Sequence, residues 1–342
     1  MREAAEAVEA ERARYEAELA DARQRYDALR ARKSVRLALA LSDMLQSAAE
    51  PLKHTRFGAP AASALRAGAL PLKPRRIESF AAWEADGAHS QLTLRRIAKA
   101  EEALAAAPDP TIHHGWCHVC RTRSQFTHST SNLREDLTCV TCGLNNRLRA
   151  SIWLLEHECR PQPDTPIYLT EQVTSLHSVL ATRFSALQGS EYLGPDVPHG
   201  AVVDRVRNES LTDLSFDSAS FSCLLSFEVF EHIPDYRQAL RECARVLRPG
   251  GRMLFSVPFL TQSAKTLVRA RVADDGSVEH LEPAEYHGDP LSAEGCLCYQ
   301  HFGWDLLDDL RQAGFSRAWA CAYWSERFGY LGGTQIQFVA ER

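Results

Sequence analysis

The second half of the chain alternates short apolar segments with amphipathic helical segments, and this alternation limits the possible folds more than any other feature. Short apolar runs predict buried strands, and a period near 3.6 predicts helices that cover them. The predicted strands are residues 166–170, 188–193, 201–206, 220–227, 252–259, 317–323 and 334–340. The predicted helices are residues 175–184, 235–248 and 304–315. Such alternation is typical of an α/β protein, here a Rossmann-like, doubly wound, seven-stranded sheet.

The stretch 245–251, Arg-Val-Leu-Arg-Pro-Gly-Gly, predicts a tight junction between a helix and the next strand. Arg245 and Arg248 stand in the expected last helical turn, where cations interact favourably with the helix dipole. Pro249, Gly250 and Gly251 then end the helix and allow the chain to reverse.

The length of 342 residues predicts one large domain with a smaller part beside it. The first residues lack the apolar segment of a signal peptide, and the longest apolar run, 37–45, is shorter than a bilayer span. We therefore expect a cytoplasmic protein without a membrane span. In that compartment the 10 cysteines are expected to be thiols or metal ligands rather than disulfides.

The N-terminal third predicts two segments of different character. Residues 1–50 are expected to form a helical arm, because 1–33 contain Ala, Glu and Arg but no Gly or Pro. Its apolar spacing fits a weak coiled coil, which would support self-association or a partner protein, and it equally fits a single solvated helix. Residues 51–112 are proline-rich and predict a linker with one helix at 91–106.

Residues 113–150 contain the most specific local motif, two CxxC pairs. Each pair directs two thiolates toward one ion, and the stretch between the pairs is long enough for a hairpin that brings them together. The expected ligands of a structural zinc ion are Cys117, Cys120, Cys139 and Cys142. Four protein ligands close the coordination sphere, so the sequence predicts a small zinc-ribbon-like module with a structural role.

The segment 210–259 resembles the second half of class I S-adenosylmethionine-dependent methyltransferases of the type 11 group. The matching pieces are Leu214–Phe216, the Ser220–Phe221 pair, the Glu231–His232 pair and Arg245–Gly251, in the family's order. The resemblance implies an S-adenosylmethionine-dependent methyltransferase domain over residues 151–342. The cysteine module, together with "YLTEQVT", "GSEYLG" and "EYHGDP", is similar to a bacterial subgroup associated with surface-polysaccharide synthesis. That similarity implies O-methylation of a saccharide or nucleotide-linked sugar.

The resemblance also implies a set of cofactor contacts. Glu191 matches the acid that binds the ribose hydroxyls, and Glu209, Ser210 and Leu211 correspond to the adenine contacts. The full set of expected cofactor-binding residues is Thr170, Glu171, Gln172, Thr174, Glu191, Tyr192, Glu209, Ser210, Leu211, Ser226 and Phe227.

The stretch 171–175 lacks the two glycines that usually let the backbone approach the cofactor. Two explanations remain open. The loop follows another path and uses Thr170, Gln172 and Thr174 as hydrogen-bonding groups, or the pocket is degenerate and the chain is a non-catalytic scaffold.

Residues 259–303 are too long for an ordinary connection and predict a substrate lid that begins with a hairpin around Asp275 and Gly276. His287, oriented by Asp289, is the expected catalytic base. The alternative is a solvated polar loop. His232 is a further catalytic candidate, with capping and packing as its alternative role.

Charge distribution bears on a rival function. Residues 51–150 carry 14 basic and 8 acidic side chains, whereas residues 151–342 carry 16 and 26. A nucleic-acid methyltransferase that grips phosphates through the zinc module is therefore an alternative, but basic residues are few and the lid is acidic. Nucleic acid is accordingly not the expected partner.

Overall fold

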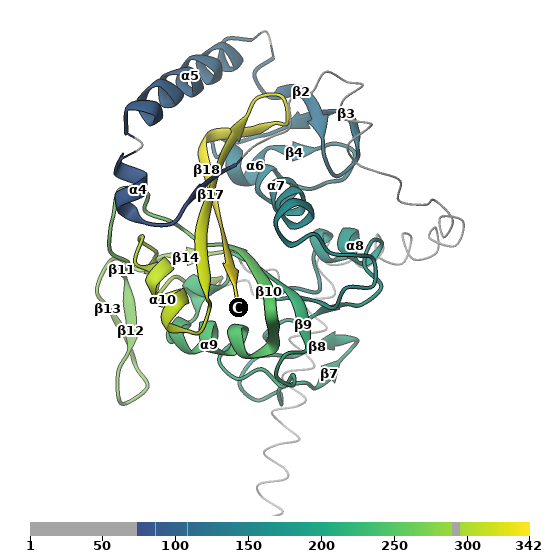
Figure 1. Ribbon diagram of the computed structural model, residues 1–342, viewed down its shortest axis with the longest axis vertical. Coiled ribbons are helices and arrows are strands. Elements are labelled where there is room, and N and C mark those ends of the chain that lie inside the picture. The colour runs from purple at the N-terminus through teal and green to yellow at the C-terminus, as the bar shows by residue number, and fades with distance from the viewer. Residues whose placement is uncertain (1–73, 86, 108, 289–294) are drawn as a thin grey trace, which may run out of the picture.

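A central seven-stranded sheet forms the body of the protein (Figure 1). The computed structural model describes residues 74–85, 87–107, 109–288 and 295–342, so the predicted helical arm lies outside the described residues. The strand order is β1-β17-β18-β10-β9-β5-β6. The strands are β1 (Arg75–Ile77), β5 (Ile167–Leu169), β6 (Leu187–Gly189), β9 (Phe221–Phe227), β10 (Leu247–Ser256), β17 (Arg317–Ser325) and β18 (Tyr330–Glu341).

Strand direction confirms the predicted doubly wound α/β architecture. Strands β6, β5, β9 and β10 are parallel, whereas β18 pairs antiparallel with both β10 and β17. The chain runs from β5 to β6 on one side and then returns to β9 on the other. This reversal creates a topological switch point between the carboxyl ends of β5 and β9, the position at which such sheets bind ligands.

The predicted third strand, 201–206, is wrong in its detail. The segment forms a small antiparallel hairpin of β7 (Val202–Val203) and β8 (Val206–Arg207). Asp204 and Arg205, at the turn, both have positive φ, as a two-residue hairpin turn of this kind requires. Parallel pairing beyond β6 is reduced to a single bridge between Glu191 and Asn208.

The seventh strand comes instead from the stretch that was expected to be a linker. Strand β1 pairs antiparallel with β17 at the opposite edge of the sheet. The predicted helix of this stretch is confirmed as α5 (Gly87–Ala105), which follows the short α4 (Phe80–Ala85). Glu101 anchors α5 to the β17–β18 hairpin, because its Oε1 accepts from Trp324 Nε1 at 3.0 Å and from the Gly332 nitrogen at 2.8 Å.

The three predicted helices of the second half are present with shorter bounds. They are α8 (Ser175–Ala181), α9 (Tyr236–Val246) and α10 (Leu306–Gln312). The side chain of Asp235 caps α9 by accepting from the Gln238 nitrogen at 3.0 Å, which satisfies a free helical N–H. Within the described part of the chain, no helix has both the length and the apolar character needed to cross a bilayer.

The Pro-Gly-Gly junction lies inside β10 rather than before it. Leu247 already pairs with Phe221, and the register then shifts before Arg252 pairs with Cys223. Gly250 has a φ of +76°, which favours glycine. A Cβ on Gly251 would lie 2.8 Å from the Arg248 carbonyl oxygen, so the irregular strand requires both glycines.

The cysteine-containing segment packs directly against the sheet. It consists of β2 (Ile112–Cys117), β3 (Thr122–Thr127), α6 (Leu133–Asp136), β4 (Thr138–Cys139), α7 (Asn146–Leu154) and the π-helix η2 (Leu155–Cys159). One hydrophobic cluster includes Cys117 and Phe126 of this segment and Val339 of β18. Arg149 of α7 is fully buried and donates to the carbonyl oxygens of Phe328 at 2.7 Å and Gly329 at 2.9 Å. The segment therefore shares a core with the sheet.

The segment 259–303 extends from the carboxyl end of β10, and its first hairpin is confirmed (Figure 1). Strands β12 (Ala270–Val272) and β13 (Val278–His280) pair antiparallel around Gly276, whose φ is +81°. The remaining short strands are β11 (Leu267–Val268), β14 (Tyr286–His287), β15 (Cys296–Leu297) and β16 (Gln300–His301). We call residues 259–303 the lid.

Candidate functional site

Thr170 and Ser226 meet at the switch point of the sheet. Thr170 follows β5 and Ser226 is the second-last residue of β9, and the Thr170 hydroxyl donates to Ser226 Oγ at 3.1 Å. The Thr170 nitrogen also donates to the Leu225 carbonyl oxygen at 3.0 Å. Two residues expected at the cofactor edge are therefore brought together at the position where the fold predicts a ligand.

Glu191 organises the glycine-free loop. Its Oε1 accepts from the backbone nitrogens of Gln172 at 2.6 Å and Val173 at 2.8 Å. The Gln172 side chain in turn donates to the Arg205 carbonyl oxygen at 2.6 Å and accepts from the Arg207 nitrogen at 3.0 Å. The loop thus follows a path fixed by the acid and by the β7–β8 hairpin.

The close backbone approach in this region occurs at Gly189 of β6. A Cβ there would lie 2.7 Å from the His177 ring and 2.8 Å from the Glu171 carbonyl oxygen. Thr174 caps α8 by accepting from the His177 nitrogen at 3.2 Å. The small residue that lets the loop pack against the sheet is therefore on the facing strand.

The residues expected around adenine have other partners. Both oxygens of the buried Glu209 accept hydrogen bonds, from Arg207 Nε at 2.7 Å and from the Ser215 nitrogen at 2.9 Å and its hydroxyl at 2.6 Å. Ser210 Oγ lies 2.8 Å from the Thr212 hydroxyl, and Leu211 is part of the main core. Glu209 and Leu211 therefore have partners within the protein, and their expected contacts with adenine stay a prediction.

Two further expected cofactor residues differ in exposure. Phe227 is buried at the end of β9, beside Ser226. Tyr192 is 57% exposed and follows Glu191 at the surface.

Glu171, another expected cofactor residue, lies at the same edge of the sheet. Burial raises the pKa of its carboxyl group above the usual value.

An ion-pair network joins the cysteine-containing segment to the carboxyl end of β9. Arg134 Nη2 of α6 lies 2.8 Å from Glu228 Oε1, and Arg147 of α7 makes two hydrogen bonds to Glu135 at 2.8 and 2.9 Å. Glu228 has a φ of +56°, an uncommon conformation for a non-glycine residue. Burial alone would raise the pKa of Glu228, but Arg134 and Arg147 outweigh it and lower that pKa to about 2.

Glu231, His232 and His287 form a cluster between the end of β9 and the lid, which we call the lid cluster. Glu231 and His232 lie in the short 3₁₀-helix η3 (Phe230–His232), and His287 comes from β14. His287 Nδ1 and His232 Nε2 each lie 3.7 Å from Glu231 Oε1. The side chain of Glu231 is 0% exposed.

Electrostatics within the lid cluster shift two pKa values. Burial raises the pKa of Glu231 to about 7, and His287 opposes that change. Glu231, followed by Glu285, raises the pKa of His287 to about 9, against the effect of burial. Perturbed groups of this kind are typical of functional sites.

The lid brings His287 next to His232 of η3, with ring centroids 4.9 Å apart, so these two catalytic candidates lie together. Asp289, expected to orient His287, lies outside the described residues. Glu285 occupies that role in the structure, since its Oε1 accepts from His287 Nε2 at 2.9 Å and from His301 Nε2 at 3.1 Å.

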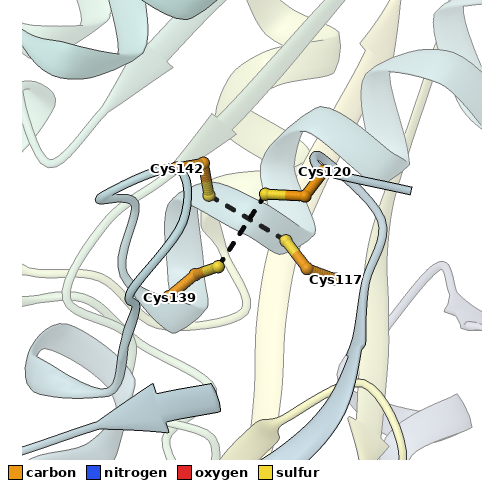
Figure 2. Close-up of side chains that lie close together, drawn as sticks. All are labelled: Cys117, Cys120, Cys139 and Cys142. Carbon is orange, nitrogen blue, oxygen red and sulfur yellow. Dashed lines mark hydrogen bonds between the residues drawn. The ribbon is translucent and has the colours of Figure 1, made fainter. Parts of the chain in front are cut away.

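The four predicted metal-ligating cysteines converge on one point (Figure 2). The sulfur atoms of Cys117 and Cys142 are 3.9 Å apart, and so are those of Cys120 and Cys139. Four sulfurs at about 2.3 Å from a tetrahedral zinc ion would be separated by roughly 3.8 Å, so the donor set fits that metal. Cys117 and Cys139 are completely buried, as is expected of a structural site.

Two features of the site, the Arg134–Glu228 pair and the buried position of Glu231, have no signal in the sequence. Arg134 and Glu228 are separated by 94 positions in the sequence, so no local spacing indicates their contact. Glu231 was noted only as part of a motif, because its burial depends on the lid folding back over η3. The Tyr299 nitrogen donates to the Glu231 carbonyl oxygen at 2.7 Å and holds that closure.

Comparison with known proteins supports a methyltransferase domain. Residues 179–255 match the family model described as a methyltransferase domain. A 27-O-demethylrifamycin SV methyltransferase of Amycolatopsis mediterranei is 28% identical over 233 residues, which cover 62% of this chain and 80% of that protein. A probable S-adenosylmethionine-dependent methyltransferase of Mycolicibacterium smegmatis is 43% identical over 53 residues, 16% of this chain and 21% of that protein.

Most of these relatives match over a small part of their own length. A ubiquinone biosynthesis O-methyltransferase of Xanthomonas oryzae is 37% identical over 62 residues, and the match spans only 26% of that protein and 18% of this chain. Among solved structures, a Mesorhizobium loti S-adenosylmethionine-dependent methyltransferase has 15% identity and a TM-score of 0.33 over 56% of this chain and 98% of that one. The family model and the curated relatives together support a similarity of this chain to class I S-adenosylmethionine-dependent methyltransferases.

Proposed function

We propose that this protein is an S-adenosylmethionine-dependent O-methyltransferase whose acceptor is a saccharide or nucleotide-linked sugar of surface-glycan synthesis. The observation that carries the proposal is the meeting of Thr170 and Ser226 at the switch point, beside the loop held by Glu191. Ligands of open α/β sheets bind at this position. The matches to methyltransferase sequences support the same chemistry.

In this proposal the cofactor binds along the carboxyl ends of β5, β6 and β9. Glu191 would bind the ribose hydroxyls while it keeps its hydrogen bonds to the loop. Thr170, Gln172, Thr174 and Ser226 would provide the polar edge toward the methionine end. When bound, S-adenosylmethionine supplies a sulfonium methyl group, which the acceptor oxygen displaces in line.

The chain's own contribution to the reaction is alignment and proton removal. Two members of the lid cluster, Glu231 and His232, lie in η3, which begins three residues after the end of β9. In this proposal the lid cluster is therefore next to the cofactor edge. It is the group through which the acceptor hydroxyl would lose its proton. His287 and His232, two of the three catalytic candidates from the sequence, both belong to it.

The acceptor class follows from resemblance and from the lid. The motif set that includes the cysteine module is similar to a polysaccharide-associated subgroup, and curated relatives include O-methyltransferases of other acceptors. Exposed polar and aromatic side chains on the lid, among them His280, Glu282 and Tyr286, suit a sugar ring. We further propose a structural zinc ion at the four cysteines, which their sulfur spacing supports.

A second candidate acceptor is RNA, and the side chains that line one surface hollow support this candidate. A hollow of about 1120 Å³ beside the cysteines is lined by Arg123, Arg327 and Trp116, among others. Arginine side chains bind phosphates and aromatic rings stack on bases, and the aromatic ring here, that of Trp116, is half-buried.

Calorimetric titration of the full chain with S-adenosylhomocysteine tests the cofactor proposal. Saturable binding of one molecule per chain is expected, and the absence of binding would leave the scaffold alternative in its place. Transfer of a labelled methyl group to nucleotide sugars, compared with RNA, then identifies the acceptor class. Labelling of RNA together with a salt-dependent gel shift would favour the second candidate over the first.

A further inference from the structure

Glu231 is a buried carboxylate without a hydrogen-bond donor. Neither of its oxygens has a hydrogen-bond partner within the described residues, although its side chain is 0% exposed. An uncompensated buried carboxylate costs several kcal/mol, by order of magnitude, so native proteins pair such groups with a cation or with strong donors. One imidazole nitrogen from each histidine of the lid cluster lies 3.7 Å from Glu231 Oε1.

Hydrogen bonds on the far side of each imidazole determine which nitrogen faces Glu231. His232 Nδ1 lies 2.9 Å from the Leu297 carbonyl oxygen, which can only accept, so Nδ1 carries the proton. His287 Nε2 lies 2.9 Å from Glu285 Oε1 and donates in the same way. In the neutral tautomers, the nitrogens turned toward Glu231 therefore present lone pairs.

Three electron-pair donors thus converge on one point. Glu231 Oε1 lies 3.7 Å from each nitrogen, which is too long for a hydrogen bond. The three ligand atoms all lie within 4.8 Å of one another. Ligands at about 2.1 Å from a shared ion are separated by roughly 3.4 to 4.2 Å, so small rotations of these side chains would complete the site.

A neighbouring group of possible ligands, Glu285, His287, Cys298 and His301, is a weaker candidate because its members have other partners. Glu285 accepts from both histidines and pairs with Arg269 at 3.1 Å. The Cys298 thiol is buried and donates to the Gln300 carbonyl oxygen at 3.4 Å. Glu285 instead fits the role of an outer carboxylate that orients a metal-binding histidine.

We propose that Glu231, His232 and His287 bind one divalent transition-metal ion, of which zinc is the representative. Two imidazoles and one carboxylate are a common ligand set for such ions and leave a coordination position for a hydroxyl or water. A metal-bound hydroxyl loses its proton more easily, so the ion would assist an alcohol acceptor, whose proton would pass to solvent water. His287 then acts as a ligand rather than as the free base expected from the sequence.

Metal analysis of the purified full chain tests this site without the methyl donor, so its result does not depend on the methyl-transfer proposal. After saturation with Zn²⁺ and removal of the excess, we expect about two zinc ions per chain, one at the cysteines and one at the lid cluster. His287→Ala should retain about one. His280→Ala, which changes an exposed histidine of the same lid, should retain both.

Cobalt distinguishes the two sites in the same samples. Co²⁺ bound by cysteines gives intense thiolate-to-metal absorption, whereas Co²⁺ bound by nitrogen and oxygen gives only weak visible bands. His287→Ala and His232→Ala should lose the weak component and keep the intense one. Wild-type protein with zinc at the cysteines alone, or a His287→Ala variant with the wild-type metal content, would overturn the proposal.

Discussion

Glu191 Oε1 accepts a hydrogen bond from the backbone nitrogen of Val173 at 2.8 Å, so this acid, two residues after β6, holds the loop that follows β5. In the family that the chain resembles, glycines let such a loop approach the cofactor, and the acid is assigned to ribose. Here the same carboxylate is also a loop support. The two functions are therefore coupled: a change at Glu191 affects the shape of the loop as well as the expected ribose contact.

Replacing Glu191 with glutamine should weaken binding of S-adenosylhomocysteine by about tenfold, because a neutral amide accepts weaker hydrogen bonds than a carboxylate. Calorimetry on the full chain measures this change. Asp196→Asn removes an exposed carboxylate from the same region and should leave the affinity unchanged. Equal affinities for wild type and Glu191→Gln would place the ribose contact elsewhere.

Gly189→Ala should destabilise the fold by about 1–3 kcal/mol, because the added Cβ would overlap its neighbours. It would meet the Glu171 carbonyl oxygen at 2.8 Å, a backbone atom that cannot turn aside. Urea unfolding followed by circular dichroism measures the loss. Gly288→Ala is the matched control, since a Cβ there has no neighbour within 4 Å among the described residues. Equal losses in the two variants would contradict the proposed packing.

The sheet could be predicted from the sequence wherever a strand is buried on both faces. The short run at 220–227 is mainly apolar, and it appears as β9 with nearly the expected bounds. The prediction of a strand at 201–206 was wrong because its central residues, Asp204 and Arg205, adopt left-handed turn conformations. The hydrophobic pattern does not indicate such conformations. Strand β1 was missed because three residues at a sheet edge give almost no periodic signal.

The candidate site was predictable where chemistry is local and not where it depends on packing. The spacing of the CxxC pairs gave the four cysteines that converge in the structure. Glu209 was assigned to adenine by its place in the order of motifs, yet Arg207 and Ser215 occupy its oxygens. Both partners lie within six residues of Glu209, and their contacts depend on the conformation of this segment rather than on a residue pattern.

Glu228 should make the fold sensitive to acid. Its pKa in the folded state is about 2, below that of an unfolded glutamate, so its contribution is present above pH ~4.3 and is lost as the pH falls toward 2. Glu228→Gln should therefore cost on the order of 2 kcal/mol at pH 7 and much less near pH 2.5. Urea unfolding of both proteins across this range measures the difference, and other carboxylates cancel between them.

The exposed Glu282 provides the comparison for that experiment. Glu282→Gln should change stability by less than about 0.5 kcal/mol at either pH. A Glu228→Gln effect that stays constant between pH 7 and pH 2.5 would contradict the ion pair with Arg134 as its source.

Loss of the zinc ion proposed at the cysteines should destabilise the sheet as well as the cysteine-containing segment, because the two share one hydrophobic cluster. Cys139→Ser should lower the zinc content by about one ion per chain and the stability by about 3 kcal/mol or more. The loss should appear in a single unfolding transition, seen alike by circular dichroism and by tryptophan fluorescence. Cys296→Ser, a change at a lid cysteine outside the four-sulfur group, should leave the zinc content unchanged. Two separate transitions in Cys139→Ser, with the sheet unfolding as in the wild type, would show that the segment folds independently despite its shared core.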